Sequence, residues 1–375
     1  MADNKDKKVL KVPDLRFPEF TDEWERKKFR DVCNITTGNK NTQDKSNDGI
    51  YPFYVRSQIV ERINSWTFDG EAILTAGDGV GVGKVFHYST GKIGVHQRVY
   101  ILSDFKCDGK YLYSYFAGHF YNRVKRMSAK NSVDSVRMEM IADMPISLPS
   151  TEEQKKIGHL LALLDERIAT QTKIIEDLKK LKSAIIEKLY SEIQGKEYSF
   201  GQLFEVVNER NKQMEYSNIL SASQEKGMVN RDDLNLDIQF ERSNINTYKI
   251  VMAGDYVIHL RSFQGGFAFA DKLGVCSPAY TILRPNSLLE YGYLSYYFTS
   301  NRFIKSLIIV TYGIRDGRSI NVEEWLNMKI AIPSKGQQFH ILKVLKSIDD
   351  KIENEEIYAT CLSNQKQYLL RQMFI

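Results

Sequence analysis

The feature that most constrains the fold of this chain is an internal repeat at an offset of 184 residues. Segment 144–168, MPISLPSTEEQKKIGHLLALLDERI, aligns with segment 328–352, MKIAIPSKGQQFHILKVLKSIDDKI, and nine of the 25 positions are identical. Weaker similarity continues upstream, where Gly94–Leu102 aligns with Gly274–Ile282. A repeat of this kind indicates one supersecondary unit written twice. We therefore expect two globular segments, each followed by the same long helix.

The start of each helix is readable from the sequence. Pro149-Ser150-x-x-Glu153 and Pro333-Ser334-x-x-Gln337 both predict a capping box, in which the serine oxygen and the third-residue side chain satisfy free backbone amides. Gly195 is expected to end the first helix in a left-handed conformation. The sequence thus predicts a helix over 151–195 and a second one over 334–375.

Apolar residues within both helices follow a heptad, which predicts a two-helix coiled coil. The stripe consists of Leu161, Leu164, Ile168, Ile175, Leu178, Ile185 and Leu189 in the first helix, and of Leu345, Ile348, Ile352, Ala359, Leu362, Leu369 and Met373 in the second. Polar residues interrupt it at equivalent places, namely Gln171 and Lys182, and Glu355 and Lys366. Matching interruptions would let the two helices keep one register.

The globular segments, 1–150 and 196–333, have the mixed pattern of α/β domains. Strands are expected at Ile73–Leu74, Val95–Leu102, Tyr256–Leu260 and Tyr280–Leu283, and aromatic-rich helices at Tyr111–Val124 and Tyr291–Ile309. The predicted fold class is α+β, with two globular α/β domains in tandem repeat and two long α-helices between them.

Composition bounds the function only loosely. The net charge is +5, which is too small to indicate a nucleic-acid binder by itself. The four cysteines are far apart and include no CxxC pair, which argues against a zinc ribbon or a disulfide framework. No apolar run approaches the ~18 residues that a membrane span requires. We expect a cytoplasmic protein.

Motifs that could carry catalysis fail on inspection. The glycine-rich segment Gly77–Lys84 lacks a phosphate-loop glycine at Asp78 and a hydroxyl residue at Val85, and it predicts a turn between strands. The nuclease-like spacing Pro13-Asp14…Glu25-Arg-Lys27 is typical of charged segments in general, and Ser277–Tyr280 only approaches an amino-methyltransferase motif and predicts an ordinary strand. The six histidines form no metal-ligand spacing. We expect no catalytic residue and no metal site.

The doubled junction Met-x-Ile-x-(Leu/Ile)-Pro-Ser-x-x-x-Gln-x-x-Ile resembles that of the specificity (S) subunit of type I restriction-modification systems, as do Trp24–Val32 and Gly94–Tyr100. The resemblance covers about residues 12–375. It implies two target-recognition domains, each reading one half of a split DNA site, and helices that pair antiparallel and separate them.

The resemblance also implies partners. These are double-stranded DNA, two methyltransferase (M) subunits and usually two restriction/translocase (R) subunits, with no membrane. The partner subunits would use S-adenosylmethionine, ATP and Mg²⁺, whereas this chain would be non-catalytic and need no cofactor. The alternatives are a protein–protein adaptor with two binding domains on a coiled coil, and, as a lesser one, an autonomous methyltransferase or nuclease.

Residues that read base edges are expected to be polar or cationic side chains on loops of the globular segments. In the first segment the candidates are Lys40, Tyr54, Arg56, Ser57, Lys84, Lys130 and Asn131. In the second they are Arg261, Ser262, Gln264, Arg315, Arg318 and Ser319. The base sequence that they would read does not follow from these residues.

Overall fold

The computed structural model describes residues 12–127, 135–223, 226–234, 242–259, 266–312 and 319–375. Contacts divide the chain into two compact units. Unit 1 comprises residues 1–173 and 357–375, and unit 2 comprises 174–356. Each unit therefore contains one globular part and one half of each long helix.

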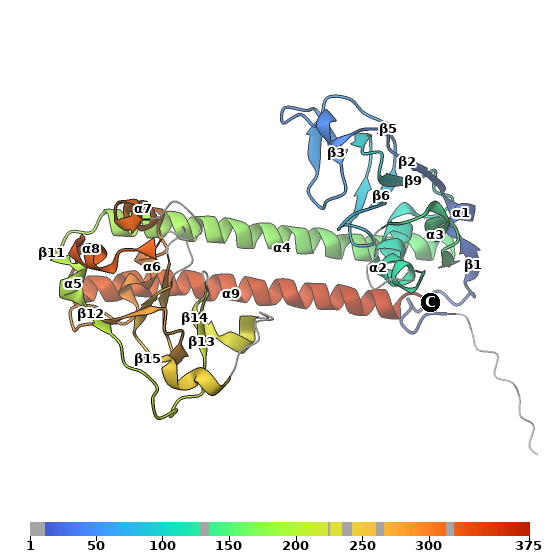
Figure 1. The fold of residues 1–375 in the computed structure, drawn as a ribbon. Coiled ribbons are helices and arrows are strands. Elements are labelled where there is room, and N and C mark those ends of the chain that lie inside the picture. The colour runs from blue at the N-terminus through green and yellow to red at the C-terminus, as the bar shows by residue number, and fades with distance from the viewer. Residues whose placement is uncertain (1–11, 128–134, 224–225, 235–241, 260–265, 313–318) are drawn as a thin grey trace, which may run out of the picture. The chain divides into compact units, whose positions relative to one another are not determined.

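The described residues of unit 1 form two four-stranded sheets and one two-stranded sheet, with helix α2 (Gly109–Met127) packed against the first sheet (Figure 1). Its elements are β1 Glu25–Lys28, α1 Phe29–Val32, β2 Asn34–Thr37, η1 Thr42–Asp44, β3 Tyr51–Tyr54, β4 Glu61–Ile63, β5 Phe68–Asp69, β6 Ala72–Ala76, β7 Phe86–Ser89, β8 Lys92–Val95, β9 Val99–Ser103, α2 Gly109–Met127, α3 Met138–Ala142, β10 Pro145–Leu148 and the first part of α4 Thr151–Ser191. The sheet orders are β2-β9-β6-β7, β4-β3-β8-β5 and β1-β10. The core forms where α2 places Leu112, Phe116 and Phe120, at helical spacing, against the first sheet and Phe29.

Unit 2 repeats part of this plan. Its elements are the end of α4, β11 Lys196–Ser199, α5 Phe200–Leu203, β12 Phe204–Val207, β13 Leu220–Ser223, β14 Gly227–Asn230, η2 Arg231–Leu234, η3 Arg242–Thr247, β15 Lys249–Val251, β16 Tyr256–Ile258, β17 Phe267–Phe269, β18 Gly274–Cys276, β19 Thr281–Pro285, α6 Tyr293–Tyr297, α7 Asn301–Ser306, η4 Leu307–Val310, β20 Thr311–Tyr312, β21 Ser319–Ile320, α8 Val322–Asn327, β22 Lys329–Ile332 and the first part of α9 Lys335–Gln372. The sheet β12-β19-β16-β17 has the same strand order as β2-β9-β6-β7, and β11-β22 corresponds to β1-β10. Two-stranded sheets β13-β14 and β15-β18 stand where unit 1 has its second four-stranded sheet. The tandem α+β architecture predicted from the repeat is confirmed.

Several element boundaries differ from the sequence predictions. Val95–Leu102 is not one strand, because His96–Arg98 forms a turn between β8 and β9, with the Val99 amide donating to the His96 carbonyl at 2.9 Å. Ser277–Tyr280 is likewise a turn, between β18 and β19, and not a strand. Tyr291–Ile309 is divided into α6, α7 and η4, because the Ser300 hydroxyl caps a new helix by accepting from the Phe303 amide.

The predicted role of Gly195 is wrong. Helix α4 ends at Ser191, and Gly195 does not lie in the left-handed region. A Cβ at this position would lie 2.2 Å from the Ile332 carbonyl oxygen. Glycine is required here because the backbone of β22 approaches closely, and not because the helix needs a left-handed cap.

Helices α4 and α9 pair antiparallel within each unit. In unit 1, Lys366 forms an ion pair with Asp165, and Arg167 lies over the Tyr358 ring at 5.8 Å. In unit 2, Lys182 forms an ion pair with Asp349. The predicted seam residues are all buried or half-buried: Leu161, Leu164, Ile168, Ile175, Leu178, Ile185, Leu345, Ile348, Ile352, Leu362 and Leu369. The two lysine interruptions are thus equivalent cross-helix pairs, each joining a lysine of one copy to an aspartate of the other.

The glutamine of the repeated junction anchors each helix to its globular part. Gln154 is buried, accepts from the Asp108 amide at 3.0 Å and donates to the Pro149 carbonyl at 2.8 Å. Its counterpart Gln338 accepts from the Glu290 amide at 2.8 Å and donates to the Pro333 carbonyl at 3.0 Å. A side chain that both donates and accepts can satisfy two backbone groups at once, which explains why both copies carry glutamine here.

Only the second predicted capping box is complete. The Gln337 amide donates to Ser334 Oγ at 3.4 Å, and the Ser334 amide donates to Gln337 Oε1 at 3.3 Å. At the first helix the Glu153 amide donates to Ser150 Oγ, but the Glu153 carboxylate accepts from Arg16 instead of from the Ser150 amide. The sequence prediction missed this because Arg16 lies 137 residues away along the chain.

Candidate functional site

Three connections of unit 1 meet at one polar cluster. They are the loop after β3, the turn between β6 and β7, and the turn between β8 and β9. Arg56 Nη1 lies 2.8 Å from Asp78 Oδ1, and Arg98 Nη1 lies 3.5 Å from Asp78 Oδ2. One carboxylate thus holds two exposed guanidinium groups, whose other N–H donors have no partner among the described residues and could meet a ligand.

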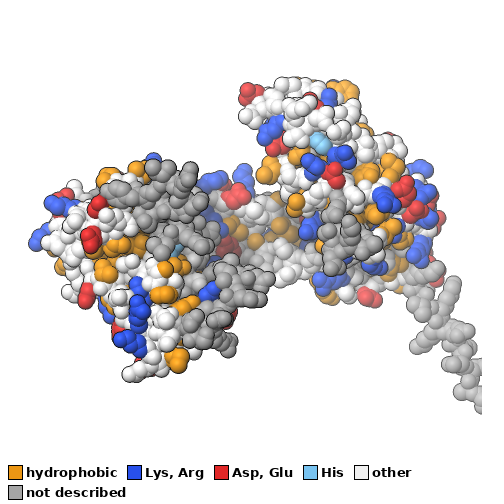
Figure 2. Space-filling view, viewed as in Figure 1, with side chains coloured by type: hydrophobic (Ala, Val, Ile, Leu, Met, Phe, Trp, Pro, Cys, Tyr) orange, Lys and Arg blue, Asp and Glu red, His pale blue; other side chains and the backbone are white. Residues whose placement is uncertain are grey.

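Three of the other predicted residues of unit 1, namely Lys40, Ser57 and Lys84, lie on or beside these connections. Lys40 forms a backbone bridge with His96, and Ser57 is exposed in the same loop as Arg56. Lys84 is exposed at the end of the β6–β7 turn, with its ammonium 5.6 Å from the centre of the Tyr121 ring. Figure 2 shows Lys and Arg side chains, carboxylates and a histidine gathered over the elements labelled β3 to β6 in Figure 1.

Tyr54, by contrast, is a core residue. It is buried, its hydroxyl donates to Ser89 Oγ at 3.0 Å, and its ring lies 5.0 Å from that of His87. Its hydroxyl is already satisfied inside the unit, so its side chain is not presented at the surface beside Arg56.

Two histidines beneath the cluster are held neutral. Burial, together with the nearby Arg56 and Arg98, lowers the pKa of His96, and burial lowers the pKa of His87. His96 Nδ1 accepts from the Arg98 amide at 3.0 Å, which requires that this nitrogen carry no proton. Neutral His96 therefore fixes the turn that presents Arg98.

The glycine-rich turn does not form a phosphate cradle. A phosphate loop needs backbone amides that point together at the ligand. Here the Val82 amide donates to the Gly79 carbonyl at 3.1 Å, and the Lys84 and Val85 amides donate to the Gly81 carbonyl at 3.0 and 2.9 Å. These three amides are bonded within the turn, in agreement with the predicted turn between strands.

Seven of the remaining predicted residues lie in segments that the structure does not describe. Lys130, Asn131, Arg261, Ser262, Gln264, Arg315 and Arg318 lie outside the described residues, and Ser319 is described only as the start of β21. The chain order is nevertheless informative. Segment 260–265 follows β16 and precedes β17, the counterparts of β6 and β7, and segments 128–134 and 313–318 precede the corresponding helices α3 and α8. The candidates of the second copy therefore fall at connections equivalent to those of the first.

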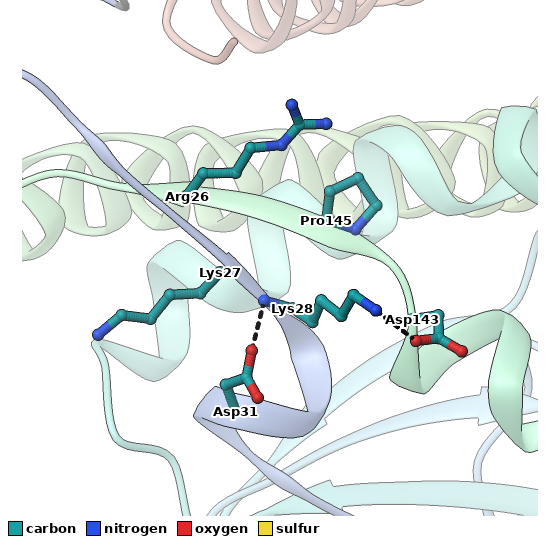
Figure 3. A pocket seen from close by; sticks show the side chains of 6 residues that line it. All are labelled: Arg26, Lys27, Lys28, Asp31, Asp143 and Pro145. Atoms are coloured by element: carbon teal, nitrogen blue, oxygen red, sulfur yellow. Dashed lines mark hydrogen bonds and ion pairs between the residues drawn. The ribbon is translucent and has the colours of Figure 1, made fainter.

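An open cleft of about 540 Å³ lies beside β1, but the side chains that line it do not point toward a common centre (Figure 3). Figure 3 shows the Arg26 and Lys27 side chains pointing away from one another, while the Lys28 ammonium lies 3.0 Å from Asp143 Oδ1. Arg30 also pairs with Asp143, at 2.6 Å. The cationic side chains of this cleft therefore either point apart or are paired with Asp143 (Figure 3).

Within the described ranges, no group of three or more His, Cys, Asp or Glu side chains is placed to hold a metal ion. Burial raises the pKa of the Cys33, Cys107 and Cys276 thiols to about 12, so these thiols stay protonated. None of the helices in the described part of the chain combines the length and apolar character needed to cross a bilayer.

Sequence reasoning missed Asp78 and Arg98 as members of the cluster. In the sequence, Asp78 marks only a departure from a phosphate-loop pattern, and Arg98 falls within a predicted strand. Asp78 lies between Gly77 and Gly79, and glycines between apolar strands are the signal of a turn that could have identified it. No glycine or proline lies beside Arg98, so the sequence carries no comparable signal for that residue.

Comparison with known proteins agrees with the doubled architecture. The family model described as "Type I restriction modification DNA specificity domain" matches residues 21–180 and 194–360. The MjaVIII specificity subunit of Methanocaldococcus jannaschii is 26% identical over 400 residues, covering 93% of this chain and 91% of that protein. The EcoDI specificity subunit of Escherichia coli is 29% identical over 168 residues, which span 44% of this chain and only 37% of that protein.

A solved structure shares the fold. The crystal structure of the type I restriction-modification S subunit from M. genitalium superposes with a TM-score of 0.62 at 14% identity, over 97% of this chain and 99% of that one. Because both copies of the family domain are present and together cover most of the residues, this chain belongs to the family of type I restriction-modification specificity subunits.

Proposed function

We propose that this chain selects the DNA target of a type I restriction-modification complex, with each globular part reading one half of a bipartite site. The observation that carries this proposal is the Arg56–Asp78–Arg98 cluster, in a chain of the specificity family. Arginine reads guanine edges in the major groove through paired donors, and a carboxylate that fixes its orientation reduces the entropy lost on binding. The equivalent connections of unit 2 would read the other half-site.

In this proposal the paired helices carry two tasks. They set the number of unread base pairs between the half-sites, and they dock two M subunits at equivalent places, because the helix sequences repeat. The complex would also take two R subunits where these are present, and it would act in the cytoplasm, where its DNA lies. S-adenosylmethionine, ATP and Mg²⁺ would be used by the partner subunits.

The first test is DNA binding by the complex purified through a tag on this chain. We expect a specific duplex to bind with an affinity that falls steeply as salt rises, because phosphate contacts release counterions. The chain alone, supplied with S-adenosylmethionine or with Mg²⁺ and ATP, is expected to show no methylation and no cleavage. Turnover by the isolated chain would contradict the non-catalytic role, and a complex that assembles without binding DNA would favour a protein–protein adaptor.

Arg56→Ala tests base reading in the first half-site. We expect it to weaken specific binding by about 1–3 kcal/mol and to relax the sequence of one half-site only. Arg62→Ala, which removes an exposed arginine from β4 of the same unit, serves as the matched control and is expected to change little. Arg315→Ala should act in the same way on the other half-site. If Arg56→Ala weakens binding equally on all sequences, Arg56 contacts phosphate and the base-reading role is wrong.

A further inference from the structure

The β6–β7 turn carries an apolar side chain that is almost fully exposed to solvent. Val80 is 97% exposed at the tip of the turn, between Gly79 and Gly81. Ile59 is 71% exposed in the adjoining loop after β3, and Val60 is also exposed. Burying such a side chain is favourable, so full exposure of a valine beside two arginines indicates a surface that becomes covered in a complex.

The turn that carries Val80 is firmly held. Its base is fixed by the Gly77 amide, which donates to the Arg98 carbonyl at 2.8 Å, and by the Val136 amide, which donates to the Gly77 carbonyl at 2.8 Å. Gly79 has a φ of +79°, and a Cβ at Gly81 would lie 2.4 Å from the Arg56 carbonyl oxygen. The glycines thus let the turn pack directly against the loop of Arg56. A Cβ at Gly79, the residue before Val80, would lie 3.9 Å from Arg56 Nη1, and Asp78, one residue earlier, pairs with both Arg56 and Arg98.

From this arrangement we infer that Val80 contacts the 5-methyl group of a thymine in the half-site read by unit 1. In the major groove the thymine methyl is the apolar feature of the base edges, and small apolar side chains recognise it, while arginine recognises guanine. An apolar tip held next to Arg56 and Arg98 matches a base step that presents a methyl group beside guanine acceptors. This inference rests on the proposed DNA recognition and assigns one base contact within it.

Deoxyuridine tests the contact, because it pairs as thymine does but lacks the methyl group. Each thymine in the half-site that Arg56→Ala relaxes is replaced in turn, and binding of the purified complex is measured. At one position, the affinity of the wild-type complex should fall about fourfold, because the duplex loses the free energy of burying one methyl-sized group. Val80→Ser should weaken binding to the thymine duplex by a similar factor, and deoxyuridine at that position should then cost it nothing more. Because Val80 is exposed, the substitution removes no internal contact.

Ile308→Ser is the matched control, since Ile308 is a comparably exposed apolar residue of unit 2. It should leave the deoxyuridine effect in the first half-site unchanged. The complex could instead bind DNA specifically while each deoxyuridine substitution lowers the affinity of wild type and of Val80→Ser by the same factor. That result would overturn the contact and leave the proposed function intact. So would a half-site without thymine, or a Val80→Ser variant that loses its M subunits and not its DNA discrimination. Absence of any specific binding would instead refute the proposed function.

Discussion

Removing seven matched residues from each long helix is expected to shorten the unread spacer of the DNA target by about three base pairs. The deletions are 167–173 in α4 and 358–364 in α9, which face one another within unit 1. Seven residues are one heptad, so the apolar seam stays in phase on both helices. The helices lose about 10 Å at 1.5 Å per residue, and this corresponds to about three base pairs at 3.4 Å each.

The two lysine–aspartate pairs lie outside these deletions, and so do all the proposed base-reading loops. The bases read at both ends should therefore stay the same, and methylation mapping in cells that carry only the variant would reveal the new spacer. Insertion of seven matched residues at the same places is the control with the opposite sign, and it should lengthen the spacer by about three base pairs. An active complex with an unchanged spacer would mean that the helices do not set this distance.

Arg16→Ala is expected to destabilise unit 1 by about 3–5 kcal/mol, because it leaves a buried carboxylate without its partner. Arg16 Nε and Nη2 each donate to Glu153 at 2.7 Å, and the Glu153 side chain is fully buried. The pair raises the pKa of the Arg16 guanidinium, so this group keeps its charge at any pH at which the protein is folded. Hydrogen exchange of peptides from the first turns of α4 localises the loss to unit 1.

A double variant separates the buried charge from the packing of the arginine stem. Arg16→Met combined with Glu153→Met removes both charges at similar volume and should restore most of the stability lost in Arg16→Ala. The exposed Arg26→Ala change in β1 is the matched control, and it should shift stability by about 0.5 kcal/mol or less. Equal stability of Arg16→Ala and Arg26→Ala would show that the Arg16–Glu153 pair does not hold the N-terminal segment to α4.

The sequence predicted the architecture well because a repeat and a heptad are long-range patterns that one chain displays without an alignment. The equivalence of Lys182 with Lys366 and of Asp165 with Asp349 is visible in the repeat, and the structure joins them crosswise. The points at which helices and strands end inside the globular parts were predicted less well. Ser300 restarts a helix through one hydroxyl, and His96–Arg98 reverses the chain without glycine or proline, so neither leaves a strong periodic signal.

Individual side chains of the candidate site depended on information that the sequence lacks. Arg56 and Tyr54 are two residues apart and both suit a DNA-binding loop by residue type. Tyr54 ends β3 and points into the core, whereas Arg56 lies just beyond the strand and is exposed. The partner of Arg56, Asp78, is 22 residues away and meets it only because β6 and β7 place their turn beside the loop after β3. Contacts of this kind require the folded sheet.

The central claim is that this chain chooses the DNA sequence on which its partners act. Methylation sequencing of cells with and without this gene, in the presence of the M subunit, tests it most directly. The account predicts that one bipartite motif, with two specified blocks separated by a spacer of fixed length, loses its methylation when the gene is absent. Methylation that stays the same at every site would contradict the account.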